Sequence, residues 1–155
     1  MRYTLSPAQT GDIETVFRLN RELIDKYENV GAIDYQVVLR QVRSGIERNI
    51  YNYMRIMCAE KNAGFVLIEK HPDRTEIDDL FLFPEFQNKG IGTALIQDVL
   101  NSSDKPVFLF VFIGNAGAVR LYKRLGFEVV ETVHGTRYRM RYDKHRHKRG
   151  DNNGV

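Results

Sequence analysis

The chain has 155 residues, of which 43% are hydrophobic and 28% are charged, and its formal net charge is +3. These values predict one soluble globular domain that can bury a core without disulfides. A single cysteine, Cys58, excludes an intramolecular disulfide framework and a cysteine-based metal site. No apolar run approaches the roughly 20 residues that span a bilayer, and the amino terminus lacks a basic and then apolar leader. We therefore expect a cytoplasmic protein with no membrane partner.

The positive charge is concentrated at the carboxyl terminus. Without residues 143–155 the chain has 19 basic and 18 acidic residues, a net charge of only +1. A nearly neutral body argues against a nucleic-acid-binding face. We interpret residues 1–142 as one domain and residues 143–155 as a basic tail, which we predict to be disordered.

The first expected elements are a short strand and two helices. The strand covers residues 2–5. Apolar residues then recur at helical spacing up to Tyr27 and predict an amphipathic helix, with Thr10 or Asp12 as its N-cap. A second helical pattern covers residues 34–53.

After residue 53 the spacing of apolar residues changes from the helical period to that of strands. Short apolar or alternating runs at residues 54–60, 64–69 and 76–83 predict an antiparallel meander, and Pro84 should end its third strand because proline cannot donate to a ladder. Cys58 lies in the first of these runs, where we expect it to be a buried small side chain.

The last expected elements alternate between helix and strand. The pattern predicts a helix, a buried strand, a helix that ends at Gly126 and a final hairpin, at residues 90–100, 106–112, 115–125, 127–133 and 137–142. The order of elements favours an α+β (mixed α/β) fold.

The segment at residues 84–93, between the meander and the next helix, carries the strongest chemical signal. Gly90 and Gly92 lack the side chains that would keep a ligand away from the backbone. The helix that begins there offers unpaired N–H groups and the positive end of its dipole, a combination suited to phosphate, and Lys89 would add charge. Glycines before a helix can also simply ease a tight turn, so this structural alternative stays open.

Two common nucleotide motifs are excluded by the same residues. A Walker loop requires lysine after its second glycine, but Lys89 precedes Gly90. A dinucleotide fingerprint requires a third glycine at the position of Leu95.

Two motifs in this chain resemble those of the GNAT acetyltransferase superfamily. The acyl-CoA signature of that family, Gln/Arg-x-x-Gly-x-Gly/Ala at the start of a helix, matches Gln87-Asn88-Lys89-Gly90-Ile91-Gly92. A second signature matches Asn115-Ala116-Gly117-Ala118, then Leu121-Tyr122 and Leu125-Gly126-Phe127. The resemblance covers residues 1–142 and implies the GNAT fold: a twisted, mostly antiparallel sheet flanked by helices and splayed between strands four and five.

The resemblance also implies acetyl-CoA as co-substrate and assigns its contacts. Backbone N–H groups would hold the pyrophosphate, after Gln87 leads into the loop, and they belong to Asn88, Lys89, Gly90, Ile91, Gly92 and Thr93. Backbone groups of Leu80, Phe81 and Leu82 would line the pantetheine arm and bind the thioester carbonyl. Asn115 resembles the asparagine that contacts the cofactor, although it could equally be the N-cap of its helix.

Tyr122 resembles the general acid of the family. Acyl transfer expels a thiolate, and a nearby phenol can donate a proton or a hydrogen bond as that charge develops. The alternative is that Tyr122 only packs in the core.

The attacking amine must be neutral. Deprotonating an amine of pKa about 10.4 at pH 7 costs about 4.6 kcal/mol, so a base is expected. Glu76, Asp78 and Asp79 are candidates, and Asp78 falls where many relatives carry an acidic residue. Adjacent strand residues face opposite sides, so at most one of Asp78 and Asp79 can face the acceptor. Some relatives carry a base at the position of Phe110, which cannot serve here.

These observations predict an N-acetyltransferase that moves an acetyl group from acetyl-CoA to a primary amine, on a small molecule or a peptide, by direct attack in a ternary complex. We expect no metal; His145 and His147 lie in the tail, and His71 and His134 lie at turns that should be exposed to solvent. Two alternatives stay open: a non-catalytic acyl-CoA-binding or sensing module, and a protein acetyltransferase that docks through its tail. Pairing into a homodimer is also left open.

Overall fold

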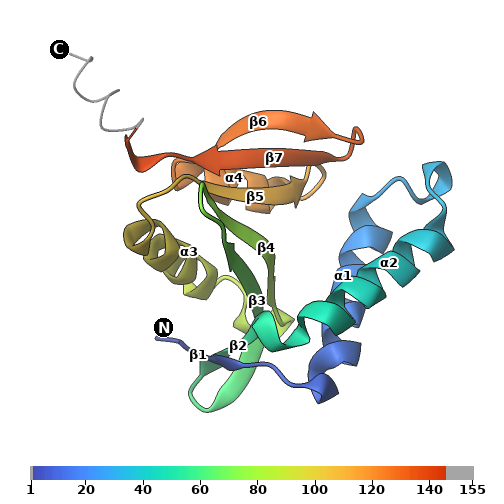
Figure 1. Ribbon diagram of the computed structural model, residues 1–155, viewed down its shortest axis with the longest axis horizontal. Coiled ribbons are helices and arrows are strands. Elements are labelled where there is room, and N and C mark those ends of the chain that lie inside the picture. Colours follow the sequence, from blue (N-terminus) through green and yellow to red (C-terminus); the bar gives the residue numbers. More distant parts are fainter. Residues whose placement is uncertain (1, 146–155) are drawn as a thin grey trace. The chain divides into compact units, whose positions relative to one another are not determined.

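The computed structural model describes residues 2–145, so residues 146–155 of the predicted tail, including His147, lie outside it (Figure 1). Its strands are β1 (Thr4–Pro7), β2 (Tyr53–Cys58), β3 (Lys61–Lys70), β4 (Thr75–Leu82), β5 (Val107–Phe112), β6 (Glu128–Val133) and β7 (Arg137–Tyr142). Its α-helices are α1 (Ile13–Tyr27), α2 (Tyr35–Asn49), α3 (Ile91–Ser102) and α4 (Ala116–Arg124).

The strands form one sheet in the order β1-β2-β3-β4-β5-β7-β6. The pair β4–β5 is parallel, whereas β1–β2, β2–β3, β5–β7 and β6–β7 are antiparallel. This confirms the predicted mixed α+β class. The ladder between β4 and β5 joins three residue pairs, from Thr75–Val107 to Ile77–Leu109, so the rest of β4 lies beyond it.

The chain divides into two compact units. The first holds the residues up to Leu67 together with Asp79–Ile91, and the second holds Ile68–Asp78 together with the residues from Gly92 onward. Both β3 and β4 therefore contribute residues to each unit.

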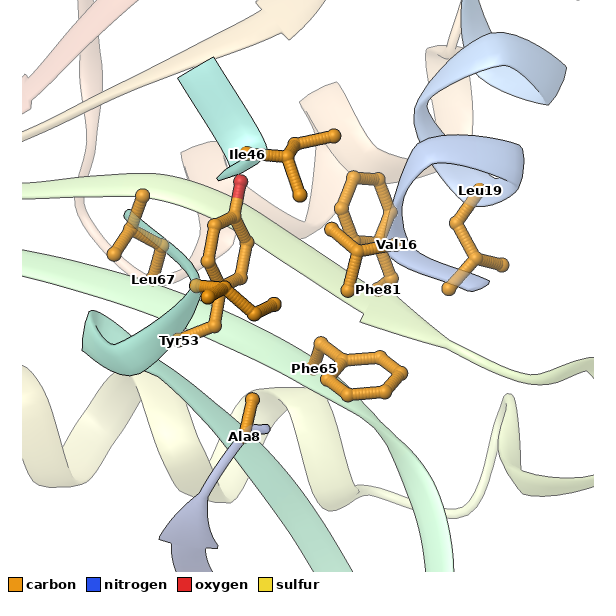
Figure 2. Close-up of a cluster of buried hydrophobic side chains, with 9 residues drawn as sticks. Ala8, Val16, Leu19, Ile46, Tyr53, Phe65, Leu67 and Phe81 are labelled. Carbon is orange, nitrogen blue, oxygen red and sulfur yellow. The ribbon is translucent and has the colours of Figure 1, made fainter. Parts of the chain in front are cut away.

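The core of the first unit forms between α1, α2 and the strands. Amphipathic spacing places apolar residues of each helix on one face, and that face is buried. Figure 2 shows the resulting cluster, which draws on β2, β3 and β4 as well as the helices and consists of Ala8, Val16, Leu19, Ile46, Ile50, Tyr53, Phe65, Leu67 and Phe81. On the outer side the helices are joined by an ion pair between Glu14 and Arg43 and by a hydrogen bond of 2.6 Å that Tyr35 donates to Asp25.

The start of α1 differs from the predicted capping. Asp12 does precede the helix, but its side chain does not cap it. The Asp12 carboxylate instead accepts hydrogen bonds from the backbone N–H of Gln9 (2.9 Å) and from Arg55 (2.8 Å).

Two element boundaries in this unit also differ from the prediction. The second helix ends at Asn49 rather than at residue 53, because a 3₁₀ turn follows and Tyr53 begins β2 opposite Leu67. The next turn lies at Ala59 and Glu60, which have φ of +49° and +66°, so β3 begins at Lys61. Neither residue favours positive φ, which is why the sequence pattern predicts the turn at residues 61–63 instead.

The second unit contains β5, β7 and β6 with α3 and α4. The left-handed Gly126 (φ +102°) follows α4, and the predicted hairpin turns at His134 and Gly135. The prediction that β5 is buried on both faces is wrong. Val107, Leu109 and Val111 are buried, but Phe110 is 43% exposed.

The outer face of β5 carries aromatic rings covered by arginines of β7. Arg139 lies 4.0 Å from the ring centroid of Phe108, and Arg137 lies 4.7 Å from that of Phe112. These stacks shield part of each ring without a second hydrophobic layer.

None of the helices within residues 2–145 is long and apolar enough to cross a membrane.

Candidate active site

The loop between β4 and α3 has the backbone conformation expected of a ligand-binding turn. A 3₁₀ turn at Pro84–Phe86 follows β4, and the Gln87 side chain then donates a hydrogen bond of 2.9 Å to the Leu82 carbonyl. Asn88 and Gly90 both adopt left-handed φ, +59° and +82°. Asparagine and glycine are the residues that accept this conformation at least cost.

The loop changes from exposed to buried where it joins α3. Residues 87–90 are exposed, whereas Ile91, the first residue of α3, is fully buried and fixes the start of the helix. The first N–H groups of α3, including those of Gly92 and Thr93, have no partner within the helix, and they lie at the positive end of its dipole. This local geometry can bind an anion such as a phosphate.

The backbone of β4 just before the loop lies tightly against β3. A Cβ atom on Gly64 would fall 1.8 Å from the carbonyl oxygen of Phe81 and 2.9 Å from the Cα of Leu82. The N–H of Phe83 donates to the Ala63 carbonyl at 2.9 Å. Only glycine at position 64 permits this approach. Sequence reasoning missed this residue, although an isolated glycine within a strand run is the signal for it.

The three acids of β4 have different surroundings. Asp79 accepts a hydrogen bond from the hydroxyl of Tyr53, a residue of the buried cluster of the first unit. Glu76 pairs with Arg74 at 2.8 Å and with Arg139 at 3.5 Å. Burial raises the pKa of Glu76, but the hydrogen bond and charge of Arg74 outweigh it, with smaller contributions from His71 and Arg139, so the net pKa lies below its usual value.

Alternation along β4 places Asp78 on the side of the strand opposite Asp79. Asp78 therefore shares a side with Glu76. Which of the two aspartates faces an acceptor stays a prediction.

Asn115 is the N-cap of α4. Its side-chain oxygen accepts from the N–H of Ala118 at 3.4 Å, and its backbone N–H donates to Phe112 at 3.0 Å. The structural alternative for this residue is thus realised. A contact with a cofactor stays a prediction, and it would use the amide nitrogen of the side chain.

Tyr122 lies on α4 with its ring edge against Phe127, the centroids 6.0 Å apart. Burial raises the pKa of its phenol to about 12. The hydroxyl therefore stays protonated at neutral pH, as a hydrogen-bond donor must.

The predicted site residues are divided between the two units. Leu80, Phe81, Leu82 and residues 87–91 belong to the first unit, and Asp78, Gly92, Thr93, Asn115 and Tyr122 belong to the second.

The prediction that His71 is exposed at its turn is wrong. Its Nε2 atom is buried and faces Glu69 and Glu76, a contact between residues of the second unit that sequence spacing gave no reason to expect.

Known structures share this fold. The PaiA N-acetyltransferase of Thermoplasma acidophilum, solved with coenzyme A, superimposes with a TM-score of 0.64 and 20% identity over 92% of this chain and 99% of that one. The spermidine N-acetyltransferase of Vibrio cholerae, solved with CoA and spermine, gives a TM-score of 0.62 and 22% identity over 90% of this chain and 94% of the other.

The family follows from the sequence match. The family model of the acetyltransferase (GNAT) family matches residues 18–127. The chain therefore belongs to the GNAT acetyltransferase family.

Curated relatives match over shorter segments. An uncharacterized N-acetyltransferase of Methanocaldococcus jannaschii is 44% identical over 72 residues, 44% of this chain and 31% of that protein. The L-amino acid N-acetyltransferase of Escherichia coli K12 is 28% identical over 81 residues, 48% of this chain and 49% of that protein. The chain thus spans half or less of the length of these relatives.

Proposed function

We propose that this protein is an N-acetyltransferase that moves an acetyl group from acetyl-CoA to a primary amine by direct attack. The observation that carries the proposal is the loop at residues 87–93. Its exposed residues 87–90, with Asn88 and Gly90 in left-handed conformation, lead into the start of α3, and its sequence resembles the acyl-CoA signature of the family.

In this proposal the backbone N–H groups of residues 88–93 bind the pyrophosphate of coenzyme A. Gln87 holds the loop to the end of β4 through its bond to Leu82. Backbone groups of Leu80, Phe81 and Leu82 line the pantetheine arm and bind the thioester carbonyl, and the Asn115 side chain contacts the cofactor.

Tyr122 acts as a hydrogen-bond donor to the sulfur. The amine nitrogen attacks the carbonyl carbon, the C–S bond breaks and the nitrogen must lose a proton. A phenol with a pKa of about 12 is a weaker acid than a thiol, whose reference pKa is about 8.5. Full proton transfer from Tyr122 is therefore uphill, so the phenol stabilises the developing thiolate and the proton finally gained by sulfur comes from the amine or from solvent.

Asp78 is the base that we propose for the acceptor amine. Asp78 lies on the other side of β4 from Asp79, at the position where the family resemblance places an acid.

The acceptor class rests on the amine chemistry shared by named relatives. These are the L-amino acid and spermidine N-acetyltransferases and the bS18-alanine N-acetyltransferase of Escherichia coli, which is 30% identical over 71 residues. We propose a primary amine on a small molecule or a peptide end. We also propose a cytoplasmic location, which the single buried thiol of Cys58 supports because reducing compartments keep such thiols free.

Two measurements on the purified full chain test the proposal. Calorimetry should show binding of coenzyme A and of acetyl-CoA, and a thiol-release assay should show turnover with at least one of amino acids, polyamines, aminoglycosides or peptides. Binding without turnover across this panel would support a non-catalytic acyl-CoA-binding module instead. Absence of any binding heat from folded protein would contradict both functions.

A further inference from the structure

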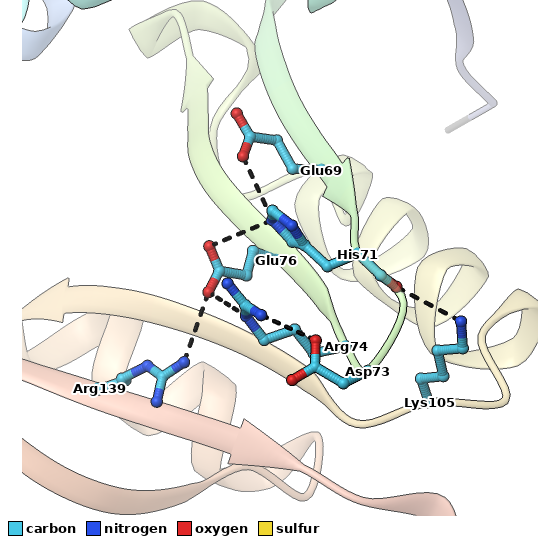
Figure 3. Close-up of polar contacts among 7 residues, drawn as sticks. All are labelled: Glu69, His71, Asp73, Arg74, Glu76, Lys105 and Arg139. Atoms are coloured by element: carbon cyan, nitrogen blue, oxygen red, sulfur yellow. Dashed lines mark hydrogen bonds and ion pairs between the residues drawn. The ribbon is translucent and has the colours of Figure 1, made fainter.

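Three metal-ligating side chains converge where β3 turns into β4, within the second unit (Figure 3). Nε2 of His71 lies 3.5 Å from Oε2 of Glu69 and 4.0 Å from Oε2 of Glu76. The three ligand atoms all lie within 4.8 Å of one another. Figure 3 shows the imidazole between the two carboxylates.

The nitrogen at the centre of this group makes no hydrogen bond. Nε2 of His71 is buried and has no hydrogen-bond partner within the part of the chain that the structure describes, although 32% of the side chain is exposed. Its separations from Glu69 and Glu76 are those of ion pairs and lie at or beyond the outer limit for a hydrogen bond. A metal ion bound by all three side chains would give this nitrogen the close partner that a buried polar atom requires.

Neighbouring cations orient the ligands without entering the space between them. Arg74 and Arg139 both contact Oε1 of Glu76, which leaves Oε2 directed at His71. Nζ of Lys105 lies 3.4 Å from the backbone carbonyl of His71 and contacts the turn from another side. Fixed second contacts of this kind hold metal ligands in place.

The donor set favours a transition metal. One imidazole nitrogen and two carboxylate oxygens suit Zn²⁺, with ligand distances of about 2.0–2.2 Å and a fourth position for water. Mg²⁺ and Ca²⁺ prefer oxygen ligands alone. Ligands about 2.1 Å from a tetrahedral ion lie about 3.4 Å from one another. The separation of 3.5 Å between His71 and Glu69 matches this value, whereas the carboxylate of Glu76, at 4.0 Å from His71, would have to move closer on binding.

We propose that Glu69, His71 and Glu76 bind a divalent transition-metal ion of the Zn²⁺ type, which would fasten the end of β3 to the start of β4. The role is structural and does not depend on acetyl transfer. Figure 3 shows three carboxylates, of Glu69, Asp73 and Glu76, and three cations, of Arg74, Arg139 and Lys105. The surroundings are therefore already balanced in charge, and the affinity should be moderate.

Titration of metal-free full-length protein with ZnCl₂ tests the site. We expect one Zn²⁺ per chain and a saturable rise in the melting temperature, because a ligand that binds only the folded state stabilises it. His71→Gln and Glu69→Gln should each weaken binding by about tenfold or more. Asp73→Asn is the matched control, since its carboxylate lies in the same turn but contacts Arg74; it should weaken binding far less than either ligand substitution.

A second control removes the other histidines that could capture zinc. The double variant His145→Gln, His147→Gln should bind as the unchanged protein does, and X-ray absorption should show only nitrogen and oxygen ligands. Unchanged binding by folded His71→Gln, loss of binding in the double variant, a sulfur ligand from Cys58, or no stoichiometric binding at all would each overturn the proposal.

Discussion

The phenol of Tyr122 combines burial with a proposed role in charge stabilisation. Tyr122→Phe removes one hydroxyl and keeps the ring that packs against Phe127. We expect kcat to fall by about 100-fold or more, while the Kd for acetyl-CoA changes little. Steady-state kinetics and calorimetry measure the two quantities. Tyr51→Phe, at a residue that is 70% exposed, is the control; equal turnover of both variants would remove the role of Tyr122.

The raised pKa of Tyr122 has its own consequence. Because the folded-state pKa is about 12 and the reference value is 10.0, the folded protein keeps this proton while the unfolded chain releases it. Its contribution to stability is therefore complete below pH 10 and is lost as the pH rises from about 10 to 12. Absorbance titration of phenolate should show a smaller high-pH component in Tyr122→Phe than in the unchanged protein; part of it remains because the hydrogen bond to Asp25 also raises the pKa of Tyr35. High-pH components of equal size in the two proteins would contradict the assignment.

Asp78 is the second residue with a testable role in catalysis. Asp78→Asn keeps the size of the side chain and removes its basicity, so kcat/KM should fall by about 100-fold or more and its dependence on pH in the acid limb should disappear. Coenzyme A binding should persist. Asp104→Asn, in the turn before β5, provides the same change at a residue outside the predicted site. If Asp78→Asn keeps the wild-type pH profile, Asp78 is not the base. The amine then loses its proton to water or through its own equilibrium.

At the scale of elements, the close approach of β3 and β4 depends on Gly64. Gly64→Ala places a methyl group against the Phe81 carbonyl, which is backbone and cannot rotate away. We expect the free energy of unfolding to fall by about 1–3 kcal/mol, the usual cost of overpacking. Gly45→Ala is the matched control, because position 45 lies within α2 and a new Cβ meets nothing closer than 3.9 Å.

The control should change stability in the opposite direction. Alanine in a helix interior is favoured over glycine by about 0.5–1 kcal/mol, so Gly45→Ala should raise the free energy of unfolding. Chemical denaturation of both variants gives the comparison. Equal effects of the two substitutions would mean that the contact at Phe81 relaxes freely.

A substitution at the start of α3 should affect stability and ligand binding differently. Gly92→Asp adds a carboxylate to the first turn, where the helix dipole favours it by about 0.3–1 kcal/mol, so the melting temperature should stay equal or rise. The new carboxylate and the pyrophosphate of coenzyme A are both negative. Two like charges about 4 Å apart repel by about 4 kcal/mol at an effective dielectric of 20, so the variant should bind coenzyme A more than tenfold more weakly. Gly92→Asn measures the effect of bulk alone. Unimpaired binding by folded Gly92→Asp would rule out the pyrophosphate assignment.

Local patterns predicted most elements because each rests on nearby residues. Asn115, Gly126 and the run at residues 107–112 define a helix start, a helix end and a strand without reference to distant parts of the chain. The boundary at Tyr53 was missed because its apolar spacing fits both the helix before it and the strand that it begins.

At the scale of the whole molecule, the order of two motifs indicated the family, and the family resemblance indicated the candidate site residues. The sequence did not predict which strands and side chains contact one another. The hydrogen bond from Tyr53 to Asp79, the arginines over Phe108 and Phe112, and the convergence at His71 all depend on strand register. Register follows from tertiary pairing, which composition and spacing do not specify.

The single sulfhydryl of the polypeptide, at Cys58, is 1% exposed within β2. A disulfide dye added during turnover would therefore register coenzyme released into solution with scarcely any background from the protein itself. With no substrate present, the same dye should react slowly with Cys58 each time the strand opens locally. One colour reaction therefore measures both the catalytic rate and the frequency of local unfolding.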